Sequence, residues 1–423
     1  MPQKIFKVDS TIERSLVVAA MLACAIGAIF ATKWGFGNSL AIRADLPEIA
    51  ELSRDLAPGD PQAHFASAVL LEKSFEPGDV EAALREYETA ASLSPNNYLL
   101  WLDLGRARER SGDRDGAEAA LRRASELAPH YSQVQWALGN VLLRQGKTDE
   151  AFVQIGKAAE GDPAFTGPAV STAAQMFQGD LSAIRRTIGD SPRLNKALSA
   201  VLATQGRLDE ALEIWRTLPQ PVKSALPNES GTLLLGKFLE AKRFRDAFIV
   251  STDLAGSAFE GYGKIANGGF EDPIKSQNAG IFEWQLGSGT QPQMAATTGQ
   301  KHSGANSLVM IFNAPDNKEF RQLSQTIAVE PGRTYEFEFY YKSQIKTQAV
   351  LRWEIATVAE AQAIGNTEPL AQATDWTPVR TRFTVPDGTD GVVVRFTREK
   401  CDSIICTISG NLWFDDLSLK PVS

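Results

Sequence analysis

The chain has 423 residues, of which 43% are hydrophobic and 22% are charged, and its formal net charge is −8. These values are typical of folded globular domains and predict two or three of them. The acidic balance argues against nucleic acid or an anionic membrane surface as the main ligand, since both require a basic face. The three histidines, His64, His130 and His302, lie far from one another and from the cysteines, which excludes a zinc site of the usual spacing.

Residues 15–32 form an uncharged apolar run near the N-terminus. As a helix this run would be about 27 Å long, enough to cross a bilayer core. Lys33 and Trp34 follow it and are suited to the membrane interface. Basic residues outnumber acidic ones in residues 1–14, so we expect this tail to be cytoplasmic and the apolar run to be a single-pass anchor. From this anchor in combination with the later parts of the chain, we expect a bacterial inner membrane, with the bulk of the chain periplasmic.

Two other interpretations of the apolar run stay open. The first is a cleaved signal peptide, whose nearest small-residue site is Ser39-Leu40-Ala41. The second is a lipoprotein signal that ends at Cys24. With an uncleaved anchor, residues 33–60 are expected to be a linker and a first helix.

Small and apolar residues recur every 34 positions in the next part of the chain. The recurring positions include an alanine set (Ala83, Ala117, Ala151), a second alanine set (Ala90, Ala124, Ala158) and a proline set (Pro95, Pro129, Pro163). Several positions in the same register indicate a repeated structural unit of two helices.

The clearest unit covers residues 97–127, with one helix on each side of the turn SGDRDG. Gly105 and Ala117 would let the two antiparallel helices approach closely, while Trp101 and Leu121 fill the space between them and their neighbours. Asp113 and Asp115 are placed to cap the second helix. The sequence therefore predicts a compact helical hairpin in this unit.

Trp101, Leu104, Gly105 and the closing Pro129 follow a W-x2-L-G…P pattern. This unit resembles the tetratricopeptide repeat family, and the resemblance is strong over residues 61–163. It implies an all-α solenoid, because one such hairpin cannot bury its own apolar face and a stack can.

Two later segments, at 205–215 and 240–250, copy the turn and second helix of the unit at 145–155. They extend the expected solenoid to residues 61–257, with some five helix pairs. The resemblance implies a concave surface that binds a protein partner, whose identity the sequence does not give.

After an expected linker at 258–265, helical periodicity gives way to alternation with a period of two residues. Alternating runs of β-branched and aromatic residues, separated by turn signals, predict an antiparallel β-sandwich over residues 266–421. The main runs are 334–341, 349–355, 379–385, 391–397 and 412–419.

Six short motifs in this region resemble the jelly-roll carbohydrate-binding modules of the family 4/9 type. They are NGGFE at 267–271, Trp284, HSGANSL at 302–308, VEPGRTY at 329–335, Trp376 before FTV at 383–385, and FDDLSL at 414–419. The resemblance implies a jelly-roll fold and a polysaccharide ligand.

The alternation divides the strand residues between the core and one opposite, charged face. The expected inward residues are Tyr335, Phe337, Phe339, Leu351, Trp353, Phe383 and Phe396, and the opposite face carries Glu336, Glu338, Tyr340, Arg352, Glu354, Arg380, Arg382 and Arg395. We expect ligand contacts from six of these, namely Glu338, Tyr340, Arg352, Glu354, Arg382 and Arg395. The arginines suit bidentate recognition of an acidic glycan. This face offers a single aromatic, Tyr340. The alternative to ligand binding is cross-strand Glu–Arg pairing on a solvated sheet.

The family resemblance also implies a structural calcium ion held by one carboxylate from each end of the module. Here these would be Glu271 and Asp415, with Asp416 as the alternative to Asp415. Cys401 and Cys406 are predicted to form a hairpin disulfide, which agrees with an extracytoplasmic location; two buried free thiols are the alternative.

We find no catalytic motif, and the two modules occupy most of the chain, so we do not expect an enzyme. The first functional hypothesis is a membrane-anchored extracytoplasmic adaptor, with the solenoid engaging a protein and the jelly roll binding an envelope or exported polysaccharide. The alternative is an assembly scaffold of the cell envelope that binds no glycan.

Overall fold

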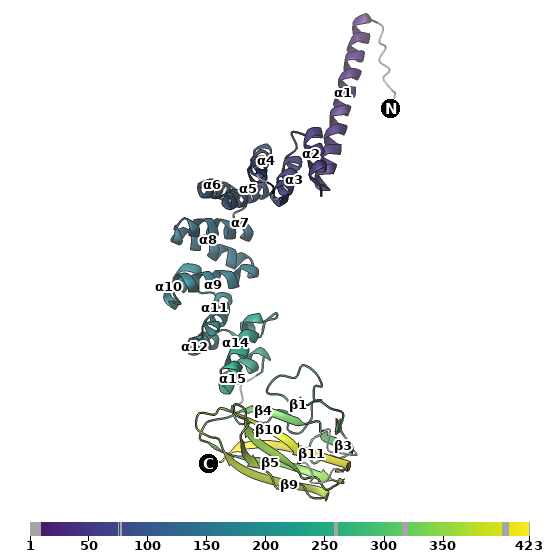
Figure 1. The fold of residues 1–423 in the computed structure, drawn as a ribbon, viewed down its shortest axis with the longest axis vertical. Helices are drawn as coiled ribbons and strands as arrows, with labels where there is room; N and C mark the ends of the chain where they lie inside the picture. The colour runs from purple at the N-terminus through teal and green to yellow at the C-terminus, as the bar shows by residue number, and fades with distance from the viewer. Residues whose placement is uncertain are drawn as a thin grey trace, which may run out of the picture. The chain divides into compact units, whose positions relative to one another are not determined.

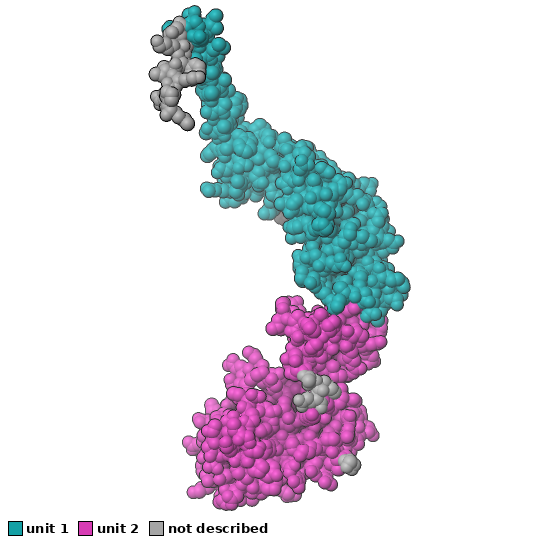
Figure 2. Space-filling view, turned by 180° about the vertical axis from the view of Figure 1, so that it is seen from behind, with its two compact units in different colours: residues 1–194 teal, residues 195–423 magenta. Residues whose placement is uncertain are grey.

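The computed structural model describes residues 10–422 apart from 75, 77, 258–260, 315–319 and 400–405. The chain divides into two compact units, residues 1–194 and residues 195–423 (Figure 2). The described part of the first unit is helical, and the second contains further helices followed by antiparallel β-sheets (Figure 1). This confirms the expected order of an apolar N-terminal helix, an all-α region and a β-sandwich.

The first helix, α1 (Thr11–Ile42), extends on both sides of the apolar run. It begins with a capping box, in which Ser10 Oγ accepts a hydrogen bond from Glu13 N at 3.2 Å and the Glu13 carboxylate accepts one from Ser10 N. Its most apolar 18-residue window has a mean hydropathy of 2.3 and none of it is buried. The helix is therefore long and apolar enough to cross a membrane, a property that an N-terminal signal sequence would share.

The last turns of α1 pack against α2 (Pro47–Leu56) and α3 (Pro61–Ser74). Ser53 Oγ donates to Gly37 O at 2.8 Å, and Asn38 Nδ2 donates to Asp60 Oδ2 at 2.7 Å. A side chain at Gly37 would meet Ala57 Cβ at 2.8 Å, so the helices touch where glycine leaves room. The segment expected as a linker and first helix thus contains the packed end of α1 and the whole of α2.

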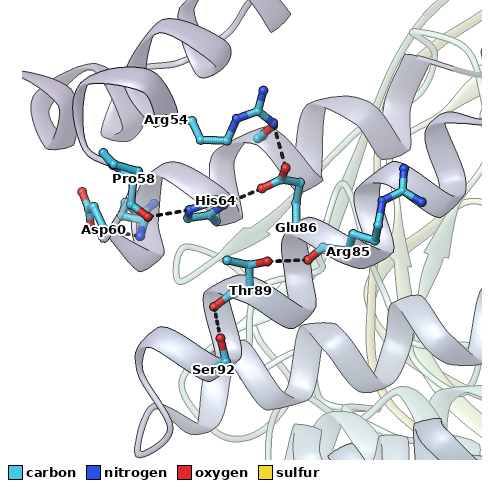
Figure 3. A network of polar contacts seen from close by, with 10 residues as sticks. Arg54, Pro58, Asp60, His64, Arg85, Glu86, Thr89 and Ser92 are labelled. Carbon is cyan, nitrogen blue, oxygen red and sulfur yellow. Dashed lines mark hydrogen bonds and ion pairs between the residues drawn. The ribbon is translucent and has the colours of Figure 1, made fainter.

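A polar network joins α2, α3 and α4 (Asp79–Leu93) close to this contact (Figure 3). His64 Nδ1 lies 2.5 Å from Glu86 Oε2, and His64 Nε2 lies 3.0 Å from Pro58 O. The other Glu86 oxygen accepts from Arg54 at 2.7 Å. Because its partners come from three segments, the network fixes their packing by hydrogen bonds as well as by apolar contact.

The 34-residue repeat corresponds to helical hairpins. α5 (Tyr98–Ser111) pairs with α6 (Arg114–Leu127), and α7 (Ser132–Arg144) pairs with α8 (Thr148–Gly161). A Cβ at Gly105 would lie 2.5 Å from Leu121 Cγ, and a Cβ at Gly139 would lie 2.7 Å from Ile155 Cγ1. The glycines are therefore required by close helix contact, as predicted.

One helix pair was missed from the sequence. α9 (Thr166–Met176) and α10 (Leu181–Ile188) follow a 3₁₀ turn at Pro163–Phe165. These helices have 11 and 8 residues, against 14 in each helix of the α5–α6 hairpin. The short pair explains why the spacing of the later copies departs from multiples of 34.

The second unit begins within α11 (Pro192–Thr204), which is followed by α12 (Leu208–Thr217), α13 (Gln220–Ser224), α14 (Glu229–Glu240) and α15 (Phe244–Leu254). The copies recognised at 205–215 and 240–250 are thus the second helices of hairpins. Trp215 on α12 is fully buried, and its Nε1 donates a hydrogen bond to Asp253 Oδ2 on α15 at 2.9 Å.

The sandwich consists of two antiparallel sheets. The five-stranded sheet has the order β1 (Gln285–Leu286), β4 (Leu323–Ala328), β10 (Gly391–Arg398), β7 (Leu351–Thr357), β8 (Ala363–Asn366). The second sheet has the order β2 (Gln293–Thr297), β3 (Ser307–Ala314), β11 (Ile408–Pro421), β5 (Thr334–Ser343), β9 (Ala373–Thr384), with β6 (Lys346–Thr347) beside β11; we call it the six-stranded sheet. All seven residues predicted to face inward are buried, and Phe414 joins their cluster.

Candidate functional site

The structure divides the six predicted ligand residues between the two sheets. Glu338 and Tyr340 lie on β5 and Arg382 lies on β9, on the outer face of the six-stranded sheet. The other three, Arg352, Glu354 and Arg395, lie on β7 and β10 of the five-stranded sheet. The expectation of one shared charged face is therefore wrong, because alternation tells which residues point outward and not from which sheet.

Three aromatic side chains, Tyr340 among them, lie in successive contact on the outer face of the six-stranded sheet. The His302 ring stacks on the Tyr340 ring with a centroid distance of 3.7 Å and an interplanar angle of 14°. Trp376, at the start of β9, presents its ring to His302 at 5.9 Å and 63°. We call Tyr340, His302 and Trp376 the aromatic group. The expectation of a single aromatic on the outward face was wrong.

A second tryptophan belongs to the same face. Trp413 on β11 pairs with Lys342 on β5, two positions from Tyr340 on the same side of the strand. It is only 8% exposed, and Lys342 Nζ donates to Gln300 Oε1 at 2.9 Å. The Trp413 side chain is therefore nearly buried, whereas the side chains of the aromatic group are more accessible to solvent.

Cross-strand ion pairs continue this face along β5 and β9. Arg382 Nε donates to Glu336 Oε2 at 2.8 Å, and Arg380 Nε donates to Glu338 Oε1 at 2.7 Å. The Arg382 hydrogen bond lowers the pKa of Glu336. The side chains of Arg380 and Arg382 are still 61% and 66% exposed, so guanidinium donors face solvent. Exposed pairs of this kind contribute little to stability, because solvent screens the charges.

The three predicted residues on the five-stranded sheet also form ion pairs. Arg395 Nε donates to Glu354 Oε1 at 2.6 Å, and Arg352 Nη2 lies 2.7 Å from Glu399 Oε1. Arg352 and Arg395 are 24% and 28% exposed, less than half the exposure of the arginines on the other sheet. These residues match the alternative prediction of a paired, solvated sheet.

Carboxylates from the two ends of the module hold the loop that carries His302. Asp415 is fully buried, and its Oδ2 accepts from His302 N at 2.7 Å and from Ser303 N at 3.1 Å. Asp416 Oδ2 lies 2.6 Å from His302 Nδ1, and Asp416 Oδ1 accepts from Ser303 Oγ at 2.7 Å. Burial raises the pKa of Asp415, and these backbone amides oppose the shift.

Glu271 holds the next turn of the same loop. Its Oε1 accepts from Ala305 N at 2.9 Å, and a Cβ at Gly304, whose φ is +58°, would collide with it. The carboxylates predicted to bind calcium thus accept hydrogen bonds from N–H and O–H donors of this loop. Among the residues described, no group of three or more His, Cys, Asp or Glu side chains is placed to hold a metal. These contacts hold the loop that carries His302, and the calcium ion stays a prediction.

The predicted disulfide falls partly outside the described residues. Cys406 is buried in the sandwich, and Cys401 belongs to the segment 400–405. The pairing of the two cysteines therefore stays a prediction.

Comparison with known families identifies both modules. Residues 263–403 match a family described as carbohydrate binding domain, of the 4/9 type, and residues 75–124 and 102–165 match the tetratricopeptide repeat. The chain therefore combines tetratricopeptide repeats with a C-terminal carbohydrate-binding domain. The repeats suggest protein interaction and the C-terminal domain suggests carbohydrate binding; both families are binding modules without catalytic function.

Individual relatives cover parts of the chain. The BBSome complex member bbs-4 of Caenorhabditis elegans is 34% identical over 115 residues, which make up 27% of this chain and 24% of that protein. A solved structure described as "CBM4 structure and function" is 20% identical with a TM-score of 0.29 and covers 37% of this chain and 99% of its own. The crystal structure of MamA protein is 15% identical with a TM-score of 0.30 and covers 52% of this chain and 96% of its own. The chain spans about a quarter of the length of the curated relative.

Proposed function

We propose that this chain is a membrane-anchored extracytoplasmic adaptor of a bacterial inner membrane. In this proposal α1 spans the membrane with the N-terminus in the cytoplasm, and the helical repeats engage a protein partner. The β-sandwich binds an envelope or exported polysaccharide at the outer face of its six-stranded sheet.

The observation that supports glycan binding is the aromatic group beside exposed arginines. Sugar rings have apolar C–H faces that are stabilised against aromatic rings by burial of apolar surface. One face of the Tyr340 ring is covered by His302, so we assign stacking to His302 and Trp376. Arg380 and Arg382 lie on the neighbouring strand, where their exposed donors suit the carboxylates of an acidic glycan.

Membrane anchoring is supported by the continuity of α1. Its apolar part is exposed, while the packed residues Gly37 and Ala41 lie in its last turns. A helix with exposed apolar side chains on all sides is stable in a bilayer and unfavourable in water. Lys33 and Trp34 separate the two parts at the position expected for the membrane interface.

A second candidate function is an assembly scaffold without a glycan ligand. The observation that favours it is the pairing of Glu336 with Arg382 and of Glu338 with Arg380. Such pairs satisfy the charges of the sheet without any ligand.

The test is polysaccharide binding by the full chain in detergent, over neutral and acidic polysaccharides. The double variant His302→Ala, Trp376→Ala removes the two rings that we assign to sugar stacking. Tyr131→Ala, which removes an exposed aromatic of the helical region, is the matched control. Binding that the double variant loses and Tyr131→Ala retains would support the glycan receptor. A folded chain that binds no polysaccharide would favour the scaffold. Alkaline carbonate extraction of membranes tests the anchor separately, since a spanning α1 would keep the chain in the pellet.

A further inference from the structure

The N-terminus of the last helix, α15, receives its cap from the β-sandwich. Asp390 lies in the loop between β9 and β10, and its Oδ1 accepts from Phe244 N at 3.0 Å. The second oxygen, Oδ2, accepts from Arg245 N at 3.1 Å. Arg243, at the cap position of α15, makes no side-chain cap hydrogen bond. A residue about 145 positions away therefore performs the role that a local Ser, Thr, Asp or Asn usually has.

Apolar packing accompanies this cap. Phe244 is 6% exposed, and a Cβ at Gly391 would lie 2.4 Å from its ring, so the first residue of β10 must be small for the helix to dock. The Phe248 ring meets the Phe282 ring of the sandwich edge-on at 5.0 Å. α15 also contacts β4 (Figure 1). The helix thus buries aromatic side chains against the sandwich and not only against α14.

The described part of the connection between α15 and the sandwich lies along β4. Gly263 N donates to Ala328 O at 2.8 Å. The amide of Gln325, which is 1% exposed, exchanges two hydrogen bonds with the backbone of Ala266, at 2.9 and 3.0 Å. Residues 261–266 are therefore fixed to the sheet edge, and the linker expected at 258–265 is in this part a bound segment.

We infer that the sandwich is the C-terminal cap of the helical stack, so that α14, α15 and the β-sheets open and close as one cooperative unit. Stacks of helical repeats have an apolar face at each end, which a terminal element must cover. Here β4, beyond the two residues that pair with β1, and the loop that precedes β10 cover it. This inference is independent of the glycan proposal, which concerns the other sheet.

The test is hydrogen exchange, followed by mass spectrometry, on the full chain in detergent. Asp390→Ala removes the cap, and Asp387→Ala, in the same loop and exposed, is the matched control. We expect Asp390→Ala to raise exchange roughly fivefold to tenfold in α15 and, by a similar factor, in β4 and β10, because loss of a cap shifts the opening equilibrium of the whole unit. Asp390→Asn keeps one acceptor oxygen and should give an intermediate increase in both regions.

Two results would overturn the inference. The first is an increase restricted to α15 while β4 and β10 keep their protection. The second is an equal response to Asp387→Ala. If Asp390→Ala prevents folding, Asp390→Asn decides the matter: exchange that rises in α15 alone contradicts a shared unit, and a parallel rise in both regions supports it.

Discussion

The two outer faces of the β-sandwich share one feature and differ in two. Both carry glutamate and arginine side chains that pair across neighbouring strands. On the six-stranded sheet the arginines are about two-thirds exposed and lie near the aromatic group, and on the five-stranded sheet the arginines are about one-quarter exposed. Charge alone therefore does not mark a binding face; accessible donors next to a stacking platform do.

The aromatic group is built by a loop that is distant in the sequence and by the first residues of β9 itself. His302 reaches Tyr340 because Asp415 and Asp416 hold its loop against the middle of β11. Trp376 is supplied by the early start of β9. Replacing residues on one face at a time tests whether this difference has a function.

The largest expected effect follows replacement of Trp376. Trp376→Ala should weaken polysaccharide binding about tenfold, since loss of one stacking surface of roughly 60 Å² costs about 1.5 kcal/mol. Trp376→Phe retains a flat ring and should recover most of the affinity. Titration calorimetry of the full chain measures both. An unchanged Kd in Trp376→Ala would show that Trp376 does not stack against the sugar.

The next effect concerns the exposed arginines of the same face. Arg382→Ala should weaken binding of an acidic polysaccharide about threefold to fivefold and leave a neutral one unaffected, because a partly solvated ion pair contributes up to about 1 kcal/mol. The loss should shrink as salt is raised, since salt screens exposed charges. Equal losses for acidic and neutral polysaccharides would contradict a charge-based contact.

Most of the helical region could be predicted because its signal is local. The repeat spacing located the α5–α6 and α7–α8 hairpins, and the close contacts of Gly105 and Gly139 confirm the reason given for small residues there. The family match confirms this class of repeat over 75–165. The α9–α10 pair was missed because its short helices break the period on which the prediction depended.

In the sandwich, the sequence predicted which residues face inward and did not predict which strands share a sheet. Alternation assigned the inward residues correctly, since it depends only on neighbours along one strand. It did not separate Tyr340 from Arg352, which lie on different sheets, because strand order is set by contacts between distant segments. The approach of His302 to Tyr340 was missed for the same reason. The run HSGANSL was recognised only as a family motif, and nothing local indicates where its loop folds.

A smaller effect is expected on the five-stranded sheet. Arg395→Ala should change polysaccharide affinity less than about twofold, because this arginine is directed to Glu354 on the face that lacks the aromatic group. Arg352→Ala should behave in the same way. Surface plasmon resonance with the polysaccharide used for Trp376 measures both. A loss as large as that of Arg382→Ala would show that the comparison of the two faces is wrong.

The smallest effect is expected from removal of calcium. If Glu271, Asp415 and Asp416 act as a loop clamp, their oxygens are already satisfied by His302, Ser303 and Ala305, and chelation has nothing to remove. The melting temperature of the sandwich should then change by less than about 1 °C between a chelator and millimolar calcium. A ligand bound at 100 times its Kd would contribute about 2.7 kcal/mol and raise the melting temperature by several degrees. A rise of that size would show that the carboxylates turn from the loop amides to an ion, and Glu271→Gln should then abolish it.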